Sequence, residues 1–166
     1  MRQKALFQLA TGLGTPSTAR KEDFAIAKAS AAKTVLVDSE ERSDHFVVRN
    51  GVRCAGAHLI VDLYEAERLD DLDHIENTLR RCVEAAGATL LHIHLHHFEP
   101  NGGVSGVAVL AESHISIHSW PEVNYAAIDI FMCGNANPDA CVPVLREAFA
   151  SKRIAVSELL RGQGAA

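Results

Sequence analysis

The sequence of 166 residues has few cysteines, few aromatic residues and no long apolar run. Its four cysteines are scattered and show no CxxC or Cys/His finger spacing, which excludes a disulfide-stabilised scaffold and a zinc finger. No apolar stretch approaches the roughly 18 residues that a transmembrane helix requires, so we expect no membrane partner. The thiols are expected to be reduced, as in a cytoplasmic protein.

Basic residues are also scarce. Sixteen Lys and Arg residues oppose 21 Asp and Glu residues, giving a net charge of −5, and they form no basic block. This distribution excludes nucleic acid as an expected partner. Residues 1–52 carry eight basic and six acidic side chains, whereas residues 53–166 carry eight and fifteen. We therefore predict a poorly ordered N-terminal extension over 1–52, followed by a folded domain over 53–166.

The apolar residues of the domain repeat with the periods of strands and helices. A helix is predicted over 69–87, with Asp70 as its N-cap and Gly87 as its stop. The other predicted elements are a helix over 138–151 and strands over 57–64, 89–98, 103–111, 113–120, 125–133 and 153–160. The order β-α-β-β-β-β-α-β indicates an α+β domain with an antiparallel sheet and helices on one face.

Six of the nine histidines lie between His92 and His118. His92 and His94 share one face of the predicted strand 89–98 with His96, a spacing that suits a metal ion. The other face would carry Leu91, Ile93 and Leu95. His92, His94 and Glu99 also resemble the first motif of the cupins, which hold iron or manganese. A cupin, however, is an all-β barrel with no place for the helix at 69–87, and the second cupin motif is missing. We expect no metal and keep a cupin-like metal enzyme as an alternative.

Reactive side chains are concentrated in the segments GVSGVAVLAESHISIHSWPE and YAAIDIFMCG. A Ser-His-Asp hydrolase is excluded because no GxSxG elbow joins a strand to a helix. A nucleophile pair of Cys133 and His118 has suitable residue types but no supporting motif.

The segments AESHISIHSWPE and AAIDIFMCG resemble the bacterial S-adenosylmethionine decarboxylase proenzymes, the short class that forms its own pyruvoyl cofactor. The resemblance extends from about Cys54 to Leu160 and includes AGAHLIVDLYEAERLDDLD and HFEPNGGVSG. Ser119 stands where members of the family commonly have threonine. The resemblance implies a two-layer α/β sandwich that assembles as a homodimer or a higher homo-oligomer.

It also implies that the protein cuts its own backbone between Glu112 and Ser113, leaving chains 1–112 and 113–166. The Ser113 hydroxyl would attack the Glu112 carbonyl to form an ester, and elimination would convert Ser113 into a pyruvoyl group with loss of ammonia. Ser105 matches the family's residue that stabilises the cyclic intermediate, and His118 matches the base for the elimination. Because Ser113 and His118 are five residues apart, we expect a turn or bulge to bring them together.

The pyruvoyl carbonyl is expected to condense with the substrate amine as a Schiff base and to accept electrons as CO₂ leaves. Cys133 matches the family's proton donor, a role that suits a thiol because thiols are mostly protonated at neutral pH. The composition agrees with a cofactor made from the chain. Lys152 is the single lysine beyond residue 52, so the domain offers little to hold pyridoxal phosphate.

Four residues are expected to bind S-adenosylmethionine. Phe98 matches the aromatic residue that stacks on adenine, and Glu122 matches the carboxylate that holds the ribose hydroxyls. Trp120 suits the sulfonium cation, and Tyr64 is a candidate for a second stacking face. The product would be the aminopropyl donor for spermidine. Two alternatives keep the fold: a decarboxylase for arginine or ornithine, and a binding relative that never cleaves itself.

Overall fold

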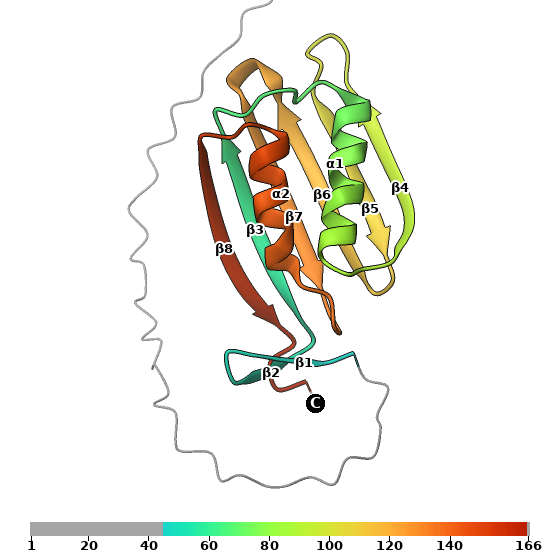
Figure 1. The fold of residues 1–166 in the computed structure, drawn as a ribbon, viewed down its shortest axis with the longest axis vertical. Coiled ribbons are helices and arrows are strands. Elements are labelled where there is room, and N and C mark those ends of the chain that lie inside the picture. Colours follow the sequence, from blue (N-terminus) through green and yellow to red (C-terminus); the bar gives the residue numbers. More distant parts are fainter. Residues whose placement is uncertain (1–44, 166) are drawn as a thin grey trace, which may run out of the picture. The chain divides into compact units, whose positions relative to one another are not determined.

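The computed structural model describes residues 45–165, and their main element is a six-stranded antiparallel sheet in the order β4-β5-β6-β7-β3-β8 (Figure 1). The strands are β3 (Gly56–Tyr64), β4 (Leu90–His97), β5 (Val104–Leu110), β6 (Ser113–Trp120), β7 (Tyr125–Met132) and β8 (Arg153–Arg161). Consecutive strands β4 to β7 are neighbours, while β3 pairs with β7 and β8. The predicted element order of the domain is confirmed.

Two helices lie against one face of this sheet (Figure 1): α1 (Leu72–Ala85) and α2 (Cys141–Ala148). Between them and the sheet is the core, which contains apolar residues at alternate positions of the central strands. Leu59, Val61 and Leu63 of β3 are at most 1% exposed, because every second side chain of a strand points to the same face. The structure is thus the expected α+β fold with two layers, and it differs from the closed all-β barrel of the cupin alternative.

The start of α1 differs by one residue from the prediction, whereas its stop is the predicted one. Asp71, and not Asp70, is the N-cap, because its carboxylate accepts a hydrogen bond from the His74 backbone N–H at 2.9 Å. Hydrogen bonding from Arg68, and then from the His74 N–H, lowers the pKa of Asp71. Gly87 follows the helix with φ of 69°, in the left-handed conformation expected of a glycine stop.

Strand β4 departs from the predicted alternation at its start. A register shift lies between Leu90 and His92 where β4 pairs with β5. As a result Leu91 is 63% exposed, whereas Ile93 and Leu95 pack against the core. The expectation that Leu91 joins them was wrong, because an extra residue in one strand changes the face on which the next side chain lies.

A short hairpin precedes the sheet and was not predicted. It consists of β1 (Val47–Arg49) and β2 (Val52–Cys54), which pair with each other, so the predicted boundary at residue 52 falls inside it. The rest of the predicted extension, residues 1–44, lies outside the described residues. No helix within 45–165 is long and apolar enough to cross a membrane.

Two short 3-10 helices complete the described chain. One, η1 (Pro121–Val123), connects β6 to β7, and the other, η2 (Pro138–Ala140), leads into α2. The first of them is important for the site because it carries Glu122 directly after the end of β6.

Candidate active site

The predicted cleavage site lies in the tight turn between β5 and β6. Leu110 pairs with Ser113, so only Ala111 and Glu112 connect the two strands. Glu112 has φ of 61°, a left-handed conformation that costs a side-chain-bearing residue roughly 1–2 kcal/mol. The peptide bond expected to break therefore follows a residue in an unfavourable backbone conformation.

Cys133, at the end of β7, contacts both residues of this peptide bond. Its thiol donates to the Glu112 carbonyl oxygen at 2.9 Å, and its backbone N–H donates to Ser113 Oγ at 3.3 Å. The Cys133 Sγ and Ser113 Oγ atoms are 3.7 Å apart. Ser113 is buried, with 8% of its surface exposed. The structure thus brings the candidate nucleophile, the carbonyl group and the candidate proton donor together.

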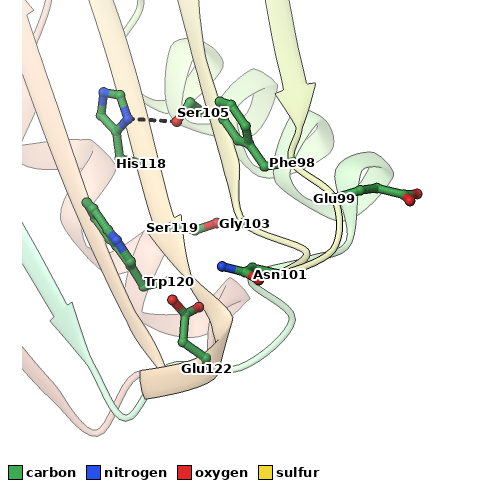
Figure 2. Close-up of a pocket in the computed structure, with 9 residues that line it drawn as sticks. All are labelled: Phe98, Glu99, Asn101, Gly103, Ser105, His118, Ser119, Trp120 and Glu122. Carbon is green, nitrogen blue, oxygen red and sulfur yellow. Dashed lines mark hydrogen bonds between the residues drawn. The ribbon is translucent and has the colours of Figure 1, made fainter. Parts of the chain in front are cut away.

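A second group of predicted residues lies at the other end of β6. Ser105 and His118 are paired across β5 and β6, and Ser105 Oγ is 2.7 Å from His118 Nδ1 (Figure 2). Either residue can be the donor, depending on the histidine tautomer. This hydrogen bond fixes the imidazole on the face of the sheet that the helices leave open.

The Ser105–His118 pair borders a cavity of about 380 Å³ (Figure 2). Its lining combines aromatic rings with polar groups, as is typical of pockets for small molecules. Three of the four predicted substrate residues, Phe98, Trp120 and Glu122, line it. The complete lining is Phe98, Glu99, Asn101, Gly103, Ser105, His118, Ser119, Trp120 and Glu122.

The predicted turn or bulge between Ser113 and His118 is absent. Strand β6 is regular from Ser113 to Trp120, with buried residues at every second position. Ser113 consequently lies on the helix-covered face and His118 on the open face, separated along the strand by about 17 Å. The prediction that a turn or bulge brings the two residues together was wrong.

Tyr64 does not line the cavity. The Tyr64 ring lies 5.4 Å from the Tyr125 ring, and the Tyr125 ring lies 5.3 Å from the Trp120 ring. The Arg153 guanidinium lies over the Tyr64 ring, 3.6 Å from its centre. A hydrogen bond from Tyr125 to Asp62, together with burial, raises the pKa of the Tyr125 hydroxyl to about 12. Tyr64 has no contact with the cavity, and its role in substrate binding stays a prediction.

Sequence reasoning missed Ser119 and Asn101 as cavity residues. The Ser119 hydroxyl accepts from the Val104 N–H at 2.8 Å and donates to the Leu69 carbonyl at 2.7 Å. These bonds tie the cavity wall to the chain before α1. The PNGG turn was the available signal for Asn101, because such turns carry functional side chains at strand ends.

The histidines of β4 do not form a metal site. His92 and His94 are exposed, and the Glu99 side chain points away from the cavity (Figure 2). Within residues 45–165, no group of three or more His, Cys, Asp and Glu side chains is placed to hold a metal ion. The geometry gives the cupin alternative no ligand set.

Comparison with known families agrees with this arrangement. The family model of S-adenosylmethionine decarboxylase matches residues 57–162, which include every strand of the large sheet and both sites. The chain belongs to this family. The matched region contains the β5–β6 turn and the residues that line the cavity, and it begins after the β1–β2 hairpin.

Individual relatives extend the comparison. The chain is 46% identical over 112 residues to the S-adenosylmethionine decarboxylase proenzyme of Thermomicrobium roseum, covering 67% of this chain and 97% of the relative. It is 46% identical over 114 residues to the proenzyme of Parasynechococcus marenigrum, covering 67% and 88%. The crystal structure of adenosylmethionine decarboxylase from Aquifex aeolicus is similar, with a TM-score of 0.58, 33% identity and coverage of 64% and 90%.

Proposed function

We propose that this protein cuts itself between Glu112 and Ser113 and then decarboxylates S-adenosylmethionine, yielding the aminopropyl donor of polyamine biosynthesis. Membership of the family supports the activity. The proposal of self-cleavage rests on the contact of the Cys133 thiol with the Glu112 carbonyl oxygen at 2.9 Å, beside the Ser113 hydroxyl.

The first part of the cleavage, the acyl shift from nitrogen to oxygen, uses groups that already touch one another. Ser113 Oγ attacks the Glu112 carbonyl carbon, its proton passes to the departing amide nitrogen, and the acyl group moves from nitrogen to oxygen. The Cys133 thiol, which donates to that carbonyl oxygen, stabilises the negative charge that develops there. Loss of the Ser113 Cα proton and of the Glu112 carboxylate then breaks the ester, and water replaces the nitrogen, which leaves as ammonia.

The surroundings of Ser113 fit a pyruvoyl group made at this position. The backbone N–H of Cys133 donates to Ser113 Oγ and the thiol lies 3.7 Å away, so two donors face the oxygen that leaves with the Glu112 carboxylate, while the pyruvoyl oxygen would replace the Ser113 nitrogen. A pyruvoyl group supplies a carbonyl that binds the substrate amine and withdraws electrons as CO₂ leaves. Cys133 is then the nearest candidate to return a proton to the substrate.

The cavity supplies groups suited to the rest of the substrate. Phe98 and Trp120 offer aromatic faces to an adenine ring and to the sulfonium cation. Glu122 offers a carboxylate that can accept two hydrogen bonds from the ribose hydroxyls. Arginine and ornithine have neither group, so this lining favours the nucleoside substrate over them.

The distance between the two sites supports a homodimer with shared active sites. In one copy Ser113 and His118 lie on opposite faces of β6, about 17 Å apart along the strand. A base must reach the proton it removes within about 3 Å. A second copy that places its cavity against Ser113 of the first meets this requirement, and two-fold symmetry completes both sites at once.

Denaturing mass spectrometry of the purified protein tests the function. We expect two chains, 1–112 and a pyruvoyl-blocked 113–166, and release of CO₂ from carboxyl-labelled S-adenosylmethionine. The Ser113→Ala variant should remain a single chain of 17.9 kDa without activity. An intact chain in active wild-type protein, or CO₂ released from arginine or ornithine at a comparable rate, would contradict the proposal.

A further inference from the structure

His45, two residues before the β1–β2 hairpin, contacts the proposed cleavage site. His45 Nδ1 lies 2.6 Å from Glu112 Oε2, and both side chains are about half exposed, at 57% and 49%. His45 is outside the residues that match the family model, and no part of the predicted mechanism uses it. Its partner is the residue whose carbonyl group is attacked.

The backbone of His45 contacts the other side of the same site. Gly134 donates its N–H to the His45 carbonyl at 2.9 Å, and Gly134 directly follows Cys133. A Cβ atom on Gly134 would lie 3.5 Å from His45 Nδ1, so the two residues are in close contact. His45 therefore connects the turn that carries Glu112 to the strand end that carries Cys133.

The hairpin that follows His45 is fixed to the domain by ion pairs. Arg49 pairs with Asp139 at 2.5 Å and also with Glu158 of β8. Burial lowers the pKa of Arg49, but the hydrogen bond and charge of Asp139 and the charge of Glu158 outweigh it, so the pKa is raised overall. Because the hairpin is held in this way, little additional ordering is needed to keep His45 on Glu112.

We propose that His45 is a positioning residue for self-cleavage. By holding the Glu112 carboxylate, it stabilises the left-handed conformation of Glu112, in which the carbonyl group meets the Cys133 thiol and the Ser113 hydroxyl. An intramolecular attack depends steeply on such alignment. The proposal rests on the proposed self-cleavage, and it gives the segment outside the family match a specific role in that step.

Two substitutions of equal size separate this role from a general effect on the fold. The side-chain nitrogen of asparagine can replace His45 Nδ1 as a donor to Glu112, whereas aspartate places a negative oxygen there. In the full-length chain we expect His45→Asn to cleave within about twofold of the wild-type rate and His45→Asp roughly tenfold more slowly. Val48→Asp is the matched control, since its side chain is 73% exposed on the same hairpin, and it should cleave at the wild-type rate.

The experiment follows the disappearance of freshly synthesised proenzyme in a cell-free reaction by denaturing mass spectrometry. Once cleaved, the His45→Asp enzyme should show kcat and KM within about twofold of wild type, because His45 acts on the cleavage step alone. Equal rates for His45→Asn and His45→Asp, whether fast or slow, would overturn the proposal. A wild-type chain that never cleaves would instead overturn the proposed function, so the two failures are distinguishable.

Discussion

The two ends of strand β6 hold different kinds of site. At the Ser113 end the contacts are short and involve backbone groups, with Cys133 against the Glu112 carbonyl and a left-handed turn. At the other end, Ser105 and His118 border an open cavity of about 380 Å³. The first arrangement suits bond breaking within the chain, and the second suits recognition of a small molecule.

This difference shows why neither end suffices alone. The turn proposed for cleavage has a candidate nucleophile and a candidate proton donor, but His118, the candidate base, is on the opposite face of β6. The cavity has the candidate base and the candidate substrate residues, but the described residues around it include no candidate for a covalent cofactor. One regular strand keeps the two sets apart, and we propose that they cooperate across two copies of the chain.

A mixture of two variant chains tests whether Ser113 of one copy acts with His118 of another. Ser113→Ala and His118→Ala should each be inactive, because each variant lacks one residue that the complete site needs. When both are co-expressed, mixed dimers pair the intact Ser113 of one copy with the intact His118 of the other. Random pairing makes half of the dimers mixed with one complete site each, so we expect about a quarter of wild-type activity. CO₂ release from labelled substrate measures it.

The same two substitutions placed in one chain serve as the control. Co-expression of the double variant with itself should give no activity. If the mixed preparation is equally inactive although mass spectrometry of the native complex detects mixed dimers, each copy forms its own site and the shared arrangement is wrong.

Much of the fold was predictable because burial on strands and helices follows local periods. The alternation in β3 and the spacing of apolar residues in α1 each depend on neighbours within one element. The errors arose where a single residue shifts the pattern. Leu91 changes face at the register shift in β4, and Asp71 replaces Asp70 as N-cap because only its carboxylate reaches the His74 N–H.

The sequence predicted residues that the candidate site brings together, but it did not predict their arrangement. Phe98, Trp120 and Glu122 meet in one cavity as expected. The contact between His45 and Glu112 has no signal in the sequence, because the two residues are 67 positions apart and neither has a local pattern. Such contacts depend on how the hairpin and the sheet pack together, which periodicity does not encode.

A change at the cavity should affect substrate binding at that end of β6 and leave self-cleavage at the other end unchanged. Glu122→Gln removes the charge that we expect to hold the ribose hydroxyls, so KM for S-adenosylmethionine should rise roughly tenfold. Self-cleavage should be unaffected, because Glu122 does not touch the turn at Glu112. Steady-state kinetics and mass spectrometry of the same preparation measure the two effects.

Glu99→Gln is the matched control for this prediction. Glu99 also borders the cavity, but its side chain points away from it (Figure 2), so KM should change by less than about twofold. A slower cleavage in Glu122→Gln would show that the cavity residue acts on both steps, and the division of roles between the two ends would be wrong.

His114 follows Ser113 but lies on the open face, and we expect it to have a small effect on how folding stability depends on pH. Burial and the nearby charge of His58 lower the pKa of His114, with partial opposition from Asp129. The unfolded chain therefore binds this proton more readily, and folding stability contributed by neutral His114 is lost as pH falls through the unfolded value of about 6.5. Uncut Ser113→Ala protein should lose more urea resistance between about pH 7.5 and 5.5 than the same protein carrying His114→Gln. Equal losses would mean that burial and His58 do not lower the pKa of His114 in the folded protein.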